Sequence, residues 1–139
     1  RLLELNPAAF GVNQMLGVLV VLQGRADEAA AIFERETDEL PRNVGLAFAR
    51  WGQKRIEEAD AALKIAVERG AAKVAFQIAE IHGYRRDLDQ AFAWLERAAQ
   101  QHDVGIAYTR SDPFLEPLRS DPRWPVFLKK IGLHDEQLK

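Results

Sequence analysis

Two proline-containing segments recur 34 residues apart and constrain this chain more than any other feature. Leu5-Asn6-Pro7 and Leu40-Pro41 are separated by two helix-like segments, which a turn at Gln23-Gly24-Arg25 joins. A 34-residue period built from a helix, a turn and a second helix is typical of helical repeats, whose units bury their apolar faces against neighbouring units. The sequence therefore predicts an all-α fold that binds and positions partners rather than carrying out chemistry.

Three segments share a pattern that predicts the second helix of each repeat. Each has an acidic residue, an acid or amide, an alanine, and a large apolar residue four positions after the alanine. First-turn acids complement the positive end of the helix dipole, while the alanine admits a neighbouring helix and the large residue fills the space between helices. The alanines are Ala29, Ala59 and Ala91, and the large residues are Phe33, Leu63 and Leu95. Ala66 and Ala98 extend the stripe, but Glu36 departs from it.

These residues resemble the tetratricopeptide repeat family over about residues 1–103. First helices are predicted over residues 10–23, 43–53 and 73–84, each before one of the three segments. In the first repeat, five residues stand where the family favours those types: Leu16, Gly17, Ala29, Phe33 and Pro41. The aromatic residue that the family favours near the end of the first helix is replaced by Val20, Arg50 and His82. The resemblance implies a helix–turn–helix solenoid.

Residues 104–139 are predicted to cap the array. Ser-Asp-Pro occurs twice, and Asp followed by Pro is a favourable helix start. We therefore expect one short helix to begin at Pro113 and a second to run from Pro122 to about Ile131. Gly132 is expected to end the second helix. Apolar side chains able to cover an open end of the array are Phe114, Leu115, Leu118, Trp124, Phe127 and Leu128. The stretch from Tyr108 to Trp124 resembles the tail that closes such arrays in multidomain bacterial signalling proteins, after a cyclase, kinase or winged-helix domain.

The predicted organisation is a single domain over residues 1–139. Residues 1–9 match the end of a preceding repeat, residues 10–41, 42–71 and 72–103 form three repeats, and residues 104–139 form the cap. We therefore expect the chain to be part of a longer protein, in the cytoplasm. The longest apolar run, Met15 to Leu22, covers only about two helical turns, so no membrane span is expected.

The composition argues against an enzyme. The chain has 139 residues, no cysteine and three histidines, and it lacks glycine-rich phosphate loops and nucleophile motifs. Packing explains His82 better than metal ligation, and a cation at a helix end explains His102. No catalytic residue, metal or cofactor is predicted. A net charge of −2 also disfavours nucleic-acid binding, which normally needs a basic face.

A partner surface is expected on the concave face, which the first helices line in this family. The candidate residues are Gln14, Val18, Val21, Val44, Phe48, Trp51, Lys73, Phe76, Glu80 and Tyr84. Lys73 is the one cation among them, so binding of a terminal carboxylate is not implied, and an apolar or amphipathic protein segment fits better. The alternative, which we favour, is that Phe48, Trp51 and Phe76 pack within the array, because exposed aromatic patches are rare.

The predicted function is that of a protein-interaction or scaffolding module in a larger signalling protein. The first alternative is a structural or dimerising element that orients an upstream domain. An apolar edge at Val12, Leu16 and Leu19 would suit self-association through an uncapped end of the array. A helical-repeat nucleic-acid binder is the weaker alternative, because the candidate face is aromatic rather than basic.

Overall fold

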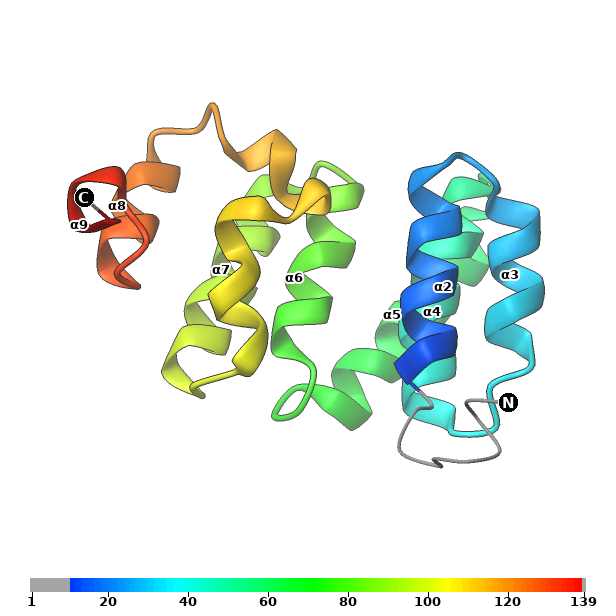
Figure 1. The fold of residues 1–139 in the computed structure, drawn as a ribbon. Coiled ribbons are helices and arrows are strands. Elements are labelled where there is room, and N and C mark those ends of the chain that lie inside the picture. The colour runs from blue at the N-terminus through cyan, green and yellow to red at the C-terminus, as the bar shows by residue number, and fades with distance from the viewer. Residues whose placement is uncertain (1–10, 139) are drawn as a thin grey trace. The chain divides into compact units, whose positions relative to one another are not determined.

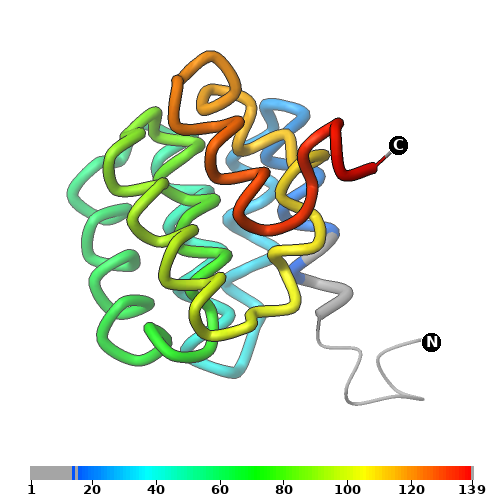
Figure 2. The backbone as a smooth tube through the Cα atoms, turned by 90° about the vertical axis from the view of Figure 1, so that its left-hand side faces the viewer, coloured from blue at the N-terminus to red at the C-terminus, as the bar shows by residue number. Residues whose placement is uncertain are grey.

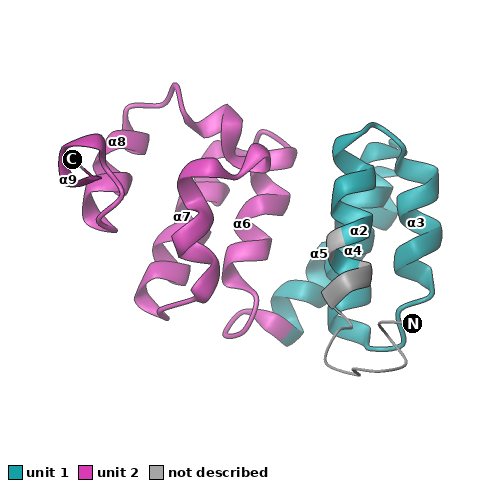
Figure 3. Ribbon diagram, viewed as in Figure 1, with its two compact units in different colours: residues 1–69 teal, residues 70–139 magenta. Residues whose placement is uncertain are grey.

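A computed structural model describes residues 11–138, with side chains for residue 14 and residues 16–138. The described chain is helical and without strands, which confirms the all-α prediction. In chain order (Figure 1) its elements are α2 (Gly11–Leu22), α3 (Ala26–Glu34), α4 (Glu39–Gly52), α5 (Ile56–Gly70), α6 (Ala75–Tyr84), α7 (Leu88–Gln100), the 3₁₀ helices η2 (Val104–Ser111) and η3 (Pro113–Leu118), α8 (Arg123–Lys130) and α9 (Asp135–Leu138). The chain forms two compact units, residues 1–69 and residues 70–139 (Figure 3), each of which is described by itself.

Phe33 of α3 forms the centre of the described part of unit 1. Its ring is buried, and it lies against two glycines, Gly17 of α2 and Gly45 of α4. A Cβ atom would lie 2.3 Å from the ring at Gly17 and 2.0 Å from it at Gly45, so both helices approach the ring through positions without a side chain. The prediction that Phe33 fills the gap between helices therefore describes its observed packing.

Alanines form the buried stripe of α5, as the sequence pattern indicates. Ala59, Ala62 and Ala66 are buried, while Leu63 is half-buried. Arg50, which replaces the expected aromatic residue on α4, links three helices: its guanidinium lies 3.2 Å from Glu34 of α3 and 3.5 Å from Glu58 of α5. An ion pair therefore takes the place of an aromatic contact there.

In unit 2, α6 and α7 pack side by side (Figure 2), and the two 3₁₀ helices lie against α6. Ala91, Leu95 and Ala98 of α7 are fully buried. On α6, a Cβ at Gly83 would lie 2.5 Å from the carbonyl oxygen of Phe114, and the Phe114 ring meets that of Tyr84 edge-on at 5.4 Å. Leu115, Leu118, Trp124, Phe127 and Leu128 are also buried, as predicted for the cap.

The turns after α2, α4 and α6 share one geometry. Gly24, Lys54 and Arg86 adopt left-handed conformations with φ of 77°, 65° and 62°. In each turn the next residue donates its backbone N–H to a carbonyl five positions earlier, at 3.1, 2.8 and 2.9 Å. This is the Schellman arrangement that ends a helix. The left-handed residues precede Ala29, Ala59 and Ala91 by five positions each, so the turn and the sequence pattern recur together.

Several boundaries differ from those predicted. α4 begins at Glu39, so the boundary after residue 41 falls inside its first turn, where proline is tolerated. α6 begins at Ala75 rather than at residue 73, and η2 was not predicted. The two predicted cap helices are present, although the first is a 3₁₀ helix: Asp112 accepts from Phe114 N and Asp121 from Arg123 N, both at 2.9 Å. The expected preceding repeat, residues 1–9, lies outside the described residues.

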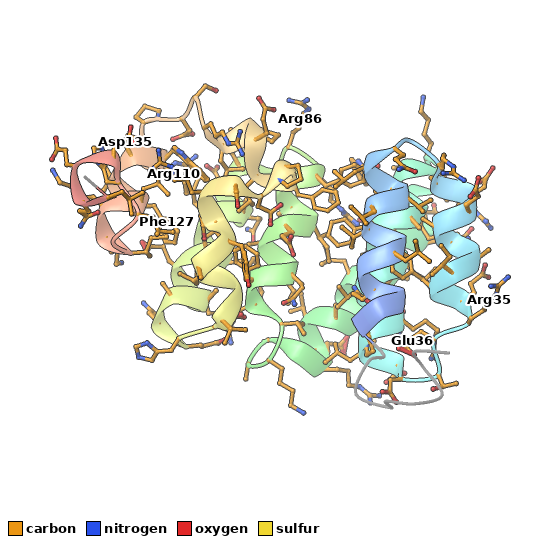
Figure 4. The ribbon with its side chains drawn as sticks, viewed as in Figure 1. Arg35, Glu36, Arg86, Arg110, Phe127 and Asp135 are labelled. Atoms are coloured by element: carbon orange, nitrogen blue, oxygen red, sulfur yellow. The ribbon has the colours of Figure 1, made fainter. Side chains whose placement is uncertain are left out.

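The structure also explains Glu36. α3 ends at Glu34, so Glu36 lies in the loop beyond the helix (Figure 4), where an alanine is not needed for helix packing. Its carboxylate accepts a hydrogen bond from Thr37 N at 2.9 Å.

Candidate interaction surfaces

Half of the predicted partner-binding residues in unit 1 belong to the core. Val21, Val44 and Phe48 are buried. Gln14, Val18 and Trp51 are half-buried and retain some contact with solvent. A buried side chain cannot reach a partner without rearrangement of the fold, so the apolar residues of this set serve mainly to hold α2, α3 and α4 together.

The predicted residues of unit 2 are divided in the same way. Phe76 is buried against Gly105 of η2, whose added Cβ would lie 2.5 Å from the ring. Lys73 is exposed, and Glu80 and Tyr84 are half-buried. Of the four aromatic candidates, Phe48 and Phe76 thus belong to the core, and Trp51 and Tyr84 are half-buried. The alternative interpretation, in which these aromatic residues pack within the array, therefore describes Phe48 and Phe76.

Apolar side chains are exposed instead along α2. Leu16, Leu19 and Leu22 lie three residues apart, on one side of the helix, and retain 48%, 51% and 41% of their accessible surface. The sequence of α2 contains no charged residue. Leu16 and Leu19 belong to the edge predicted for self-association, whereas the side chain of Val12 lies outside the described residues.

A second apolar surface is an open groove of about 630 Å³ in unit 2, between the end of α7, η2 and the end of α8. We call it the cap groove. It is lined by Ala99, Gln100, His102, Asp103, Val104, Ile106, Ala107, Lys130, Ile131 and Leu133. Val104 retains 86% of its accessible surface, an unusual exposure for a valine within a helical element. This groove is not among the predicted surfaces, because η2, which forms one wall, was not predicted.

Two charged side chains of the cap groove are already paired within the protein. Lys130 lies 2.7 Å from Glu96 of α7. Asp103 accepts from Gly105 N at 2.9 Å and from Phe76 N at 3.2 Å. With these charges satisfied, the groove offers a partner mainly apolar contact.

Hydrogen bonds and an ion pair connect η2 to the residues that follow α8, which form one wall of the cap groove. Arg110 donates to the carbonyl oxygen of Leu133 at 3.0 Å and also pairs with the Asp135 carboxylate (Figure 4). Gly132 ends α8 with a φ of 83°, as expected for the predicted stop. These contacts place Leu133 beside the groove.

His82 is a packed residue. It is buried, and its Nδ1 lies 3.7 Å from the carboxylate of Asp87. Burial lowers the pKa of the imidazole; the charge of Asp87 opposes this shift and that of Arg85 adds to it, so the neutral form is favoured in the fold. Among residues 11–138, no cluster of three or more histidine, aspartate and glutamate side chains is arranged to hold a metal ion.

Glu80 belongs to a group of three acidic residues on one side of α6. Burial raises the pKa of its carboxyl group well above the usual value of 4.5, and a hydrogen bond with Asp112 raises it further. The negative charges of Asp112 and Asp103 act in the same direction. Since these aspartates begin η3 and η2, the acidic group lies where the cap meets α6.

Comparison with known proteins identified no relative. No protein-family model, curated protein or solved structure matches this chain. Of the helices that the structure describes, none has both the length and the apolar character required to cross a bilayer.

Proposed function

We propose that this chain is a protein-interaction module of the tetratricopeptide type, and that the cap groove receives an apolar or amphipathic segment of a partner protein. The observation that carries the proposal is that Val104 is exposed in an apolar groove. Two charged side chains of this groove, Lys130 and Asp103, are already paired within the protein. Burying such a surface in a complex removes apolar area from water. Amphipathic helices commonly bind proteins in grooves of this character.

The module type rests on the sequence resemblance together with the recurring turns. The same left-handed turn precedes each of the three alanines, and Phe33 packs between α2 and α4. The resemblance of residues 104–139 to array-closing tails further suggests the regulatory or scaffolding end of a larger bacterial signalling protein, located in the cytoplasm.

The experiment compares Val104→Lys with Val126→Lys. Both valines are largely exposed, at 86% and 69%, so neither substitution removes core packing. Val104 of η2 lines the cap groove, whereas Val126 of α8 lines a different groove of about 610 Å³ between α7 and α8. A partner would first be captured from a lysate of the source organism and then purified for titration.

The proposal predicts that Val104→Lys weakens binding of the purified partner about tenfold or more, equivalent to about 1.4 kcal/mol, while Val126→Lys binds like the wild type. Equal affinity of both variants and the wild type would place the partner elsewhere. Circular dichroism of both variants checks that the helical fold is retained.

The exposed leucines of α2 favour a second candidate function, in which the chain is a dimerising element. An uncharged apolar stripe can pair with its own copy about a two-fold axis without repulsion between like charges. The molar mass by light scattering tests this: Leu19→Lys should convert a dimer into a monomer. A wild-type protein that is monomeric at high concentration would exclude it.

A further inference from the structure

We propose that the cap of unit 2 is held on α6 by a proton-dependent latch, in which Glu80 meets the two aspartates that begin η2 and η3. The latch is a property of the fold and does not depend on whether the cap groove binds a partner. It makes the attachment of residues 104–118 tighter in mildly acidic solution than at neutral or alkaline pH.

Backbone hydrogen bonds hold the two aspartates in place where the cap meets α6. Asp112 is buried and accepts from Phe114 N at 2.9 Å, the hydrogen bond that starts η3. Asp103 accepts from Gly105 N at 2.9 Å, which starts η2, and from Phe76 N on α6 at 3.2 Å. Both carboxyl groups therefore act as hydrogen-bond acceptors, and both are fixed in position by backbone donors.

α6 and the cap pack closely against each other. Gly83 and Gly105 each lack room for a Cβ atom, which would lie 2.5 Å from Phe114 O and from the Phe76 ring respectively. Tyr84 meets the ring of Phe114 at 5.4 Å. These contacts lie on both sides of Glu80 in sequence, so the backbone of α6 at Glu80 is held against the cap.

The three carboxyl groups at this junction repel one another when all of them are ionised. If Glu80 is ionised, three carboxylates share a partly desolvated space, which is unfavourable. If Glu80 is protonated, its hydroxyl can donate to the Asp112 carboxylate, and one negative charge is removed. Burial and both aspartates favour this protonated form, as the raised pKa of Glu80 indicates. The cap is thus stabilised by the uptake of one proton.

Five charged groups of the neighbouring elements have partners other than Glu80. On α7, Asp89 pairs with Arg123 and Glu96 with Lys130, while Arg97 lies over the Trp94 ring at 4.8 Å. Asp87, at the start of α7, faces His82 rather than Glu80. Beyond η3, Arg119 donates to the backbone carbonyls of Arg110 and Asp112.

The sign of the pH effect follows from the direction of the Glu80 shift. A carboxyl whose pKa is raised in the folded state stabilises that state fully below its unfolded value of 4.5, and this contribution is lost as the pH rises through the folded pKa. His82 acts in the opposite direction, because burial lowers its pKa from 6.5 and acid therefore destabilises its packed neutral form. The experiment must separate these two groups.

The test measures hydrogen exchange of backbone amides in residues 104–118, corrected for intrinsic exchange, between pH 5 and pH 8. The reference protein is His82→Gln, in which the opposing titration is absent. Into this background we would place Glu80→Gln, with Glu116→Gln as the matched control, since Glu116 is an exposed glutamate on η3.

The latch predicts severalfold higher protection at pH 5 than at pH 8 in the reference and in Glu116→Gln, and no such change in Glu80→Gln. Asp112→Asn provides a second variant, because asparagine still accepts from Phe114 N while removing the charge. It should weaken the pH dependence, because the Asp112 charge is one of the causes that raise the pKa of Glu80. A reference protein without pH dependence, or an unchanged profile in both Glu80→Gln and Asp112→Asn, would overturn the proposal.

Discussion

Gly45→Ala is expected to destabilise unit 1, although alanine is the better helix former. In an exposed helix this change stabilises by about 1 kcal/mol. Here the new Cβ would lie 2.0, 2.3 and 2.4 Å from three atoms of the Phe33 ring. The ring has little room to retreat, because its Cζ end lies against Gly17 of α2, where a Cβ would be 2.3 Å from Cζ. Overpacking of a core costs about 1–3 kcal/mol, and the short distances favour the upper end.

Subtracting the helix preference leaves a net loss of about 2 kcal/mol for Gly45→Ala. A double-mutant cycle with Phe33→Leu isolates the cause, because leucine removes the ring atoms that the Cβ meets. Hydrogen exchange of amides in residues 11–52 measures the free energy of opening of this unit. In the Phe33→Leu background, Gly45→Ala should be neutral or stabilising. A loss of the same size in both backgrounds would refute the explanation.

Three further changes follow from the packing and the turns. Gly83→Ala should loosen the cap, because its Cβ would meet the Phe114 carbonyl oxygen, and limited proteolysis near residues 104–118 should become faster; unchanged proteolysis would contradict this. Lys54→Gly should raise the free energy of unfolding by about 1 kcal/mol, since φ is 65° there and glycine adopts this conformation without a steric penalty. Urea unfolding measures this change, and a lower stability of the variant would contradict the prediction. In the Glu80→Gln background, His82→Phe should reduce the loss of thermal stability between pH 7.5 and pH 5, because the lowered pKa of His82 makes its protonation unfavourable in the fold. If the loss of thermal stability is as large in His82→Phe as in its parent, another group causes the acid sensitivity.

Helices and their buried small residues could be predicted from the sequence because these features depend on local periodicity. Ala29, Ala59 and Ala91 repeat with a large residue four positions later, and all three are buried. The cap starts at Asp112 and Asp121 were also recognisable, since a capping aspartate before proline acts within one turn.

The surfaces were harder to predict because they depend on contacts between distant elements. The position of Phe48 on a first helix suggested the concave face, but the packing of α4 buries its ring. The cap groove requires the 3₁₀ helix η2, whose sequence Val-Gly-Ile-Ala-Tyr-Thr-Arg-Ser lies outside the three segments that share the repeat pattern. The approach of Glu80 to Asp103 and Asp112 joins residues 23 and 32 positions apart, and no sequence motif marks it.

The most direct test of the interaction proposal is hydrogen exchange of the chain with and without its purified partner. Binding in the cap groove predicts slower exchange at the end of α7, in η2 and around Ile131 and Leu133, with α2 unchanged. Protection confined to α2, with the cap groove exchanging as in the free protein, would contradict the account.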